Sequence, residues 1–208
     1  MKADGILFDL DGTLWDSVDE IVTIWNQTLK KIQNHWTPIT RAELETLMGL
    51  QMDEIARKLF PLESDQRQNY FMEQCIQEEN RFLYHHGAKL YPNVRETLNQ
   101  LKKNYQLYIV SNCQSGYIEA FLHAHSLNHL FNDYLCFGDT ERSKGENINY
   151  IIHRNSLKSP TYVGDTQGDC DAATFTNIPF IYAEYGFGQV TQYDEKIQSF
   201  RDLLSVFK

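Results

Sequence analysis

The sequence predicts an α/β protein in which a doubly wound parallel sheet carries an inserted all-helical segment. Three observations support this fold class. Three short apolar runs without alternation occur along the chain, and each of the three ends directly in a polar residue; continuous apolar runs are typical of strands buried on both faces. Helical patterns alternate with these runs. The long stretch between the first and second runs contains helical patterns alone.

Three runs predict the central strands of the sheet. They are residues 6–8 before Asp9, residues 107–110 before Ser111, and residues 162–164 before Asp165. Ligands of open α/β sheets bind outside the carboxyl ends of the strands, so we expect these three polar residues to converge on one site. Apolar runs at residues 135–137 and 179–182 predict two further strands.

The helices expected around the sheet show apolar residues three or four positions apart. Pro92 suits the first turn of a helix that continues to Leu101. A second helix is expected over residues 145–154. A closing helix is expected over residues 196–207, where the apolar residues fall on one side.

Four helices are expected in the segment between the first two strands. The first and second begin at apparent capping boxes, Ser17–Glu20 and Thr40–Glu43, and the second ends near Gly49. A third helix is expected over residues 52–60, and a fourth between a Ser64 cap and Gly87. No strand pattern is visible in this segment, so we infer an all-helical insert.

Composition and charge exclude several classes of protein. The chain has 208 residues, of which 42% are hydrophobic, and this content argues against a disordered chain. A formal net charge of −9 argues against a nucleic-acid-binding surface. The sequence shows neither a signal peptide nor an apolar run that could span a membrane. Its four cysteines form no CxxC pair. We therefore expect a cytoplasmic protein with free thiols and no nucleic-acid or membrane partner.

Four polar motifs carry the chemistry expected of the site. They are Asp9-Leu10-Asp11-Gly12-Thr13, Ser111-Asn112, Lys144, and Gly164-Asp165-Thr166-Gln167-Gly168-Asp169. Each alone has an ordinary interpretation, since Asp-Gly pairs form turns, a lysine at a helix start is usually solvated, and acidic residues are common at helix N-termini. Their occurrence together at strand ends instead favours one site. Paired carboxylates at such ends suit a hard metal ion.

The order of these motifs resembles that of the haloacid dehalogenase superfamily over nearly the whole chain. The segment from Asp9 to Ser17 is especially similar to the phosphoglycolate phosphatase-like branch. The resemblance implies a Rossmann-like catalytic core of residues 1–15 and 88–208. It also implies a helical cap of residues 16–87, placed between the first and second motifs.

The resemblance further implies a Mg²⁺-dependent phosphatase that acts on a small phosphorylated metabolite. Asp9 would be the nucleophile that forms an aspartyl-phosphate intermediate. Asp11 would be the general acid for the leaving alcohol and then the base that activates water. Mg²⁺ would bind carboxylate oxygens of Asp9 and Asp165 and the backbone carbonyl of Asp11.

The remaining motif residues receive supporting roles from the same resemblance. Ser111, Asn112 and Lys144 would bind phosphoryl oxygens. Thr13 would order the loop after the first strand, and Asp169 would hold metal-bound waters or orient Lys144.

The sequence leaves alternatives open. Phosphoglycolate is the leading substrate by resemblance, beside sugar phosphates, nucleoside monophosphates and pyrophosphate. A phosphomutase of the β-phosphoglucomutase type would pass the phosphoryl group to a second hydroxyl instead of water. A non-catalytic phospho-accepting or binding module is a different class, but a helical insert after the first strand has no place in a receiver domain. The oligomeric state is not specified.

Overall fold

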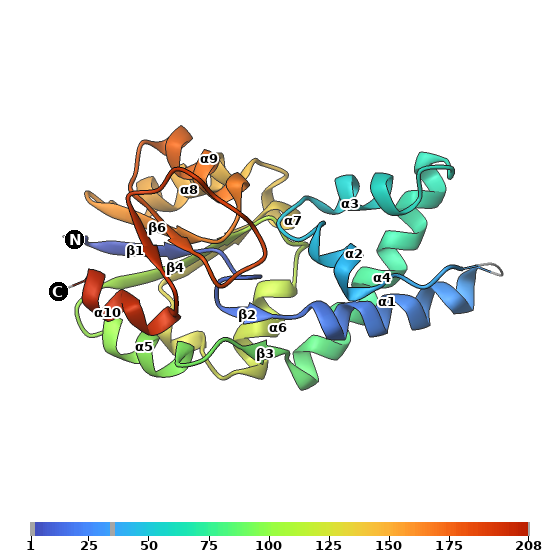
Figure 1. Ribbon diagram of the computed structural model, residues 1–208, viewed down its shortest axis with the longest axis horizontal. Coiled ribbons are helices and arrows are strands. Elements are labelled where there is room, and N and C mark those ends of the chain that lie inside the picture. The colour runs from blue at the N-terminus through green and yellow to red at the C-terminus, as the bar shows by residue number, and fades with distance from the viewer. Residues whose placement is uncertain (1–2, 34–35, 208) are drawn as a thin grey trace.

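A six-stranded parallel sheet forms the centre of the molecule. The computed structural model describes residues 3–33 and 36–207. The strand order is β5-β4-β1-β6-β7-β8, and all neighbouring strands are parallel. The strands are β1 (Gly5–Phe8), β4 (Gln106–Ser111), β5 (Asp133–Cys136), β6 (Pro160–Gly164), β7 (Phe180–Ala183) and β8 (Glu195–Ile197). The predicted doubly wound α/β fold is therefore confirmed (Figure 1).

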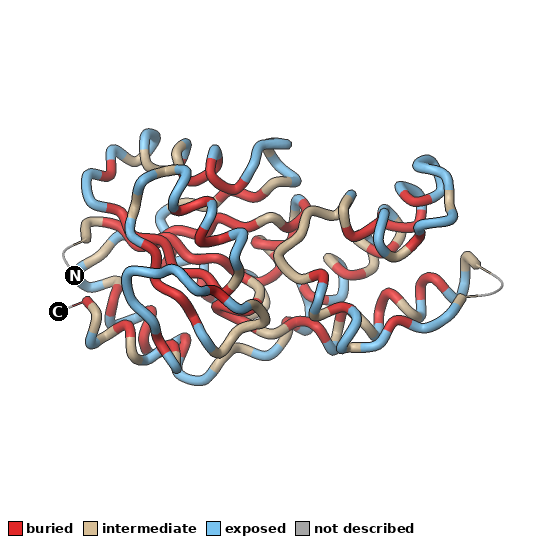
Figure 2. Tube along the Cα trace, turned by 45° about the horizontal axis from the view of Figure 1, so that its top comes forward, coloured by how far each residue is buried: buried red, intermediate tan, exposed pale blue. Residues whose placement is uncertain are grey.

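Helices cover both faces of the sheet. They are α5 (Val94–Leu101), α6 (Tyr117–Ala124), α7 (Phe137–Thr140), α8 (Lys144–Arg154), α9 (Gln167–Thr176) and α10 (Leu203–Val206). Leu7 of β1 packs among apolar residues of α8 and α9, whereas Ile6 and Phe8 pack with those of α5 and α10. Figure 2 shows the central strands buried along their length. Burial on both faces explains why these strands are continuous apolar runs.

The helical insert lies at the end of the molecule opposite both termini (Figure 1). Its helices are α1 (Val18–Ile32), α2 (Arg41–Glu45), α3 (Met52–Leu59) and α4 (Asp65–His86). The four expected helices are thus present. The long helix α4 packs along α1 within the insert and along α6 of the sheet domain. The domain limits at residues 16 and 87 stay a prediction.

Two short strands join the insert to the sheet domain and were not expected. β2 (Trp15–Asp16) pairs antiparallel with β3 (Lys89–Leu90), so the two chain crossings between the parts run side by side. Strands of two residues carry no periodic pattern, which is why the sequence does not reveal them.

The capping box expected at Ser17 is also wrong. Ser17 precedes α1, but its side chain makes no capping hydrogen bond. Its hydroxyl instead donates to Asp11 Oδ1 at 2.7 Å. The box at Thr40 and Glu43 is confirmed.

The closing helix expected over residues 196–207 is wrong. Lys196 pairs with β7 in the edge strand β8, and a 3-10 turn, Phe200–Asp202, precedes the short α10. Asp202 accepts hydrogen bonds from the backbone N–H groups of Gln198 and Ser199, which fixes the later helix start. Across residues 3–33 and 36–207, no helix is long and apolar enough to cross a membrane.

Candidate active site

Three strand ends bring the first polar residues together. β1 lies between β4 and β6, and the backbone N–H of Asp9 donates to the Val163 carbonyl at 2.9 Å. Asp9, Ser111 and Asp165 are all buried at this edge of the sheet. The expected convergence of these side chains therefore follows from the central position of β1.

Lys144 connects the nucleophile candidate to the acidic motif at α9. Its Nζ lies 3.0 Å from Asp9 Oδ1 and 2.5 Å from Asp169 Oδ1, and all three side chains are buried. Burial alone would lower the pKa of Lys144, but the charges of Asp169 and Asp9 raise it. The lysine is therefore held as a cation, since a buried charge is stable only when paired.

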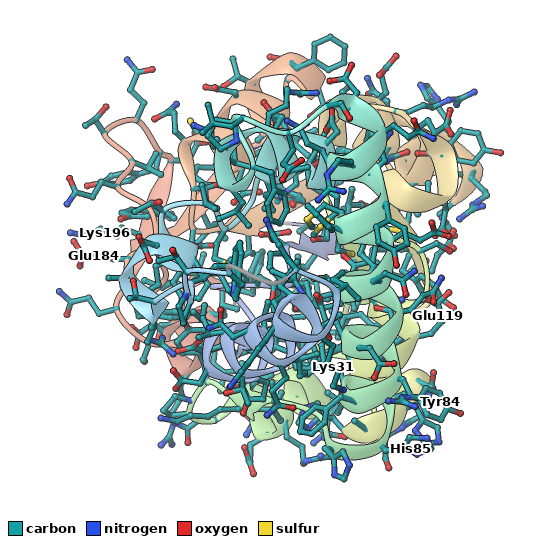
Figure 3. The ribbon with its side chains drawn as sticks, turned by 90° about the vertical axis from the view of Figure 1, so that its right-hand side faces the viewer. Lys31, Tyr84, His85, Glu119, Glu184 and Lys196 are labelled. Atoms are coloured by element: carbon teal, nitrogen blue, oxygen red, sulfur yellow. The ribbon has the colours of Figure 1, made fainter. Side chains whose placement is uncertain are left out.

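An exposed ion pair elsewhere in the molecule provides a contrast. Figure 3 shows Glu184 and Lys196 together at the outer surface, where Lys196 Nζ lies 2.6 Å from Glu184 Oε1. Exposed pairs of this kind contribute about 0–1 kcal/mol, because water solvates both partners and salt screens them. The Lys144 cluster has no such solvation, so its geometry depends on every member.

Both carboxylate oxygens of Asp169 accept hydrogen bonds. Its Oδ2 accepts from the backbone N–H groups of Asp165 and Thr166, at 3.1 and 2.9 Å, and from the Thr166 hydroxyl at 2.7 Å. Its Oδ1 accepts from Lys144 and from the Tyr162 hydroxyl, at 2.5 and 3.3 Å. With both oxygens engaged, Asp169 fixes the start of α9 and the position of Lys144.

Asp165 is oriented by the loop after β1 and by a second loop. The Thr13 hydroxyl donates to its Oδ1 at 3.2 Å, and the Phe187 backbone N–H donates to its Oδ2 at 2.8 Å. Gly12 has a φ of 81°, and a Cβ at this position would collide with the Asp165 carboxylate. A glycine is therefore required for the close approach of the loop to Asp165.

Asp9, Asp165 and Asp169 could hold a metal ion. One oxygen of each lies within 4.8 Å of the others. Burial and the Asp169 charge raise the pKa of Asp9 to about 7, although Lys144 lowers it. Burial and the charges of Asp169 and Asp9 also raise the pKa of Asp165. Buried carboxylates at this spacing provide the hard oxygen ligands that Mg²⁺ prefers, and a divalent cation would keep them ionised.

Asp11 points toward the junction with the insert. Its Oδ1 accepts hydrogen bonds from Trp15 Nε1, Ser17 Oγ and the Tyr117 hydroxyl, at 2.8, 2.7 and 2.8 Å. Burial raises the pKa of Asp11, whereas these three hydrogen bonds lower it. The contacts of Ser17 and Tyr117 were not revealed by the sequence analysis. Tyr117 lies 106 residues from Asp11, and no local pattern connects them.

Asn112 also contacts the insert. Its Nδ2 donates to the Gly49 carbonyl at 2.9 Å, and its Oδ1 is buried without a partner in the described part of the chain. The structure thus places Asn112 beside Ser111, at the boundary between the two parts of the molecule.

A small cavity lies between the strand ends and the insert. Asp9, Asp11 and Ser111 line its sheet side, and mainly apolar residues of the insert line the other side. Its volume of about 30 Å³ holds roughly two water molecules. One charged residue of the insert, Glu79, also lines the cavity, and sequence reasoning missed it. Burial raises the pKa of Glu79 to about 8.

Comparisons with known proteins agree with the fold and show the family. The family model of haloacid dehalogenase-like hydrolases matches residues 6–183. Phosphoglycolate phosphatase from Aliivibrio fischeri is 28% identical over 200 residues, covering 88% of this chain and 84% of that protein. The enzyme of the same name from Vibrio cholerae is 26% identical over 196 residues, with the same coverage.

Solved structures share the whole architecture. A crystal structure described as a predicted phosphoglycolate phosphatase from Haemophilus somnus has a TM-score of 0.87 at 26% identity, covering 98% of this chain and 97% of that one. A predicted phosphatase from Clostridium acetobutylicum has a TM-score of 0.84 at 19% identity, covering 99% and 98%, and shows the fold alone. The chain therefore belongs to the haloacid dehalogenase-like hydrolase family, within its phosphoglycolate phosphatase-like branch of phosphoric monoester hydrolases.

Proposed function

We propose that this protein hydrolyses a small phosphomonoester in a Mg²⁺-dependent reaction that passes through an aspartyl-phosphate on Asp9. One observation carries this proposal: Lys144 Nζ holds Asp9 Oδ1 at 3.0 Å inside a buried group of three carboxylates. The lysine fixes the orientation of the nucleophile and offsets its repulsion from a phosphate dianion.

In the first step, the carboxylate of Asp9 attacks phosphorus. A new oxygen–phosphorus bond forms, and the bond between phosphorus and the alcohol oxygen breaks. Asp11 donates its proton to that oxygen, so the alcohol leaves neutral. The hydrogen bonds of Asp11 all fall on Oδ1, which supports proton exchange at Oδ2.

In the second step, Asp11 accepts a proton from a water molecule, which attacks phosphorus and releases phosphate and Asp9. Mg²⁺, held by the carboxylates of Asp9 and Asp165 and the backbone carbonyl of Asp11, would neutralise charge on the phosphoryl oxygens in both steps. Ser111 and Lys144 would bind these oxygens through their side chains, and Asn112 would bind them through its backbone N–H.

Two residues act through their neighbours. Asp169 positions Lys144, because it holds the ammonium at 2.5 Å while backbone N–H groups hold its other oxygen. Thr13 orients Asp165 through its hydroxyl. Residues 16–87 would act as a cap that opens for substrate and excludes bulk water when closed.

The relatives suggest where to begin with substrates and with location. Phosphoglycolate is the first compound to test, because the relatives from Aliivibrio fischeri and Vibrio cholerae carry its name. We place the enzyme in the cytoplasm, and four buried free cysteines are consistent with a reducing compartment.

Phosphate release from a panel of small phosphomonoesters, with and without Mg²⁺, tests the proposal. We expect release that requires Mg²⁺ and is abolished by Asp9→Asn, with the variant folded by circular dichroism. Activity that survives this substitution would exclude Asp9 as the nucleophile. Rapid isomerisation of a sugar phosphate with little phosphate release would favour the phosphomutase alternative.

A further inference from the structure

Glu79 is a buried carboxyl group that the proposed reaction does not use. It lies on α4, lines the cavity from the insert side and is 0% exposed. Its Oε2 accepts from Trp25 Nε1 at 2.5 Å, and its Oε1 accepts from Gln114 Nε2 at 2.9 Å. Both partners are N–H groups that can only donate, so Glu79 is held as an acceptor.

Two further acceptors in the same cavity lack donors. Gln114 Oε1 and Asn112 Oδ1 are buried, and neither has a hydrogen-bond partner within residues 3–33 and 36–207. The amide nitrogens of both side chains are already engaged, which sets the orientation of each amide. Gln114 Nε2 donates to Glu79 Oε1 and to Asn80 Oδ1, at 2.9 and 3.1 Å. Asn112 Nδ2 donates to the Gly49 carbonyl. The oxygens are therefore the unsatisfied ends, and a ligand with N–H or O–H groups would satisfy them.

The charged residues around the cavity also favour a ligand that carries hydrogen-bond donors. Among the described residues that line the cavity, none is a lysine, an arginine or a histidine. Arg41 of the insert is already paired with three carboxylates, those of Asp16, Asp19 and Glu45. Because burial raises the pKa of Glu79 to about 8, an ammonium group in the cavity would favour its ionised form and pair with it. An alcohol bearing a carboxylate would instead meet the acceptor oxygens of Gln114 and Asn112 without a cation to balance its charge.

We infer that Glu79 is a specificity-determining residue that selects phosphomonoesters whose alcohol carries a hydrogen-bond donor and no negative charge. This inference rests on the proposed function for the phosphoryl end of the substrate and deepens it for the alcohol end. An amino alcohol binds best, because its ammonium pairs with Glu79. A neutral polyol is second, and a carboxylate-bearing alcohol is last. The substrate class of this protein therefore differs from phosphoglycolate, although its relatives carry that name.

The contrast within α4 provides a matched control. Figure 3 looks at the molecule from the insert end, where Tyr84 and His85 of α4 lie at the outer surface. Glu73 of the same helix is exposed and accepts a hydrogen bond from Gln77 Nε2 at 3.5 Å. The substitutions Glu79→Gln and Glu73→Gln make the same chemical change, inside the cavity and outside it.

The test compares kcat/KM for phosphoethanolamine, glycerol 3-phosphate and phosphoglycolate, with ethyl phosphate as a small ester whose alcohol has neither a further hydrogen-bond donor nor a carboxylate. We expect the wild-type protein to prefer phosphoethanolamine to phosphoglycolate by about tenfold or more. Glu79→Gln should lower this ratio by about tenfold, and Glu73→Gln should leave the ratio at its wild-type value.

Each contrary result would reject either the inference about Glu79 or the proposed function, and the two can be told apart. Phosphoglycolate as the best wild-type substrate would overturn the inference. So would a Glu79→Gln variant that lowers kcat/KM for all four esters by one common factor, since a purely structural role predicts that result. Hydrolysis of any of the four esters that survives Asp9→Asn, or hydrolysis of none of them by the wild type, would instead reject the proposed function.

Discussion

The two sides of the cavity are built differently. On the sheet side, buried charged groups come from strand ends, and each has several fixed partners, as Asp169 has with Lys144 and the N-terminus of α9. On the insert side, the lining is mainly apolar, and Glu79 is its charged group. This difference suits the sheet side to one phosphoryl reaction common to all substrates, and it suits the insert side to discriminating between the alcohol parts of different substrates.

Hydrogen bonds at the junction connect the sheet side of the cavity with the insert side. Asp11 comes from the sheet domain but is held by Trp15, Ser17 and Tyr117, and Asn112 is tied to the carbonyl of Gly49. Changes on the sheet side should therefore affect every substrate, changes on the insert side should discriminate between substrates, and changes at the junction should alter proton transfer.

The largest effect is expected on the sheet side, from Lys144→Met. The substitution leaves the buried carboxylates of Asp9 and Asp169 without their cation. We expect kcat to fall about a thousandfold for all substrates, and the free energy of unfolding to fall by about 3–5 kcal/mol. Steady-state kinetics and urea denaturation in the presence of Mg²⁺ measure both quantities.

Lys196→Met is the control, because it removes a lysine from an exposed pair with Glu184. Its effect on stability should stay below about 1 kcal/mol, with kcat at the wild-type level. Equal effects of the two substitutions would show that the burial of the Lys144 cluster does not matter.

An intermediate effect is expected at the junction, from Tyr117→Phe. The hydrogen bond from Tyr117 lowers the pKa of Asp11, so its removal should raise that pKa. The acid limb of the pH–rate profile, where Asp11 must be ionised to act as a base, should then move to higher pH. We expect kcat at neutral pH to fall about tenfold.

Tyr150→Phe, at an exposed tyrosine of α8, is the matched control and should leave the pH–rate profile in place. An acid limb at the wild-type position in Tyr117→Phe would show that Asp11 does not control the profile.

The smallest effect on the phosphoryl reaction is expected on the insert side, where the change is in the pH dependence of stability. Burial raises the pKa of Glu79 from 4.5 to about 8, so the folded state binds a proton that the unfolded state releases. Glu79 therefore lowers stability as the pH rises from 4.5 to about 8. Compared with Glu79→Gln, the wild type should lose up to about 5 kcal/mol more across this range, measured by urea denaturation without metal. Parallel pH profiles for the two proteins would contradict the assignment.

The sheet side of this comparison could largely be predicted from sequence. Continuous apolar runs marked the strands, and each run ended in a residue that the structure brings to the site, such as Asp9 or Asp165. The residues next to Lys144 in the sequence are typical of a solvated helix start and do not mark it as a site residue. Only the order of the motifs identified it.

The insert side could not be predicted in the same way. Glu79 lies in the polar run from Gln77 to Asn80, which is typical of a solvated helix face. It is buried because α4 packs against α6, a contact between distant parts of the chain. The pairing of β2 with β3 and the contact of Tyr117 with Asp11 have the same origin. Such tertiary contacts leave no local periodicity in the sequence.

The central claim is that Asp9 carries the phosphoryl group between the two steps. Its most direct test is rapid acid quenching during turnover with Mg²⁺ and the best substrate of the panel, followed by peptide mapping by mass spectrometry. We predict one added phosphoryl group on the peptide that contains Asp9, and none in Asp9→Asn. A phosphoryl group on another residue, or an unmodified chain in samples that are turning over substrate, would contradict the account.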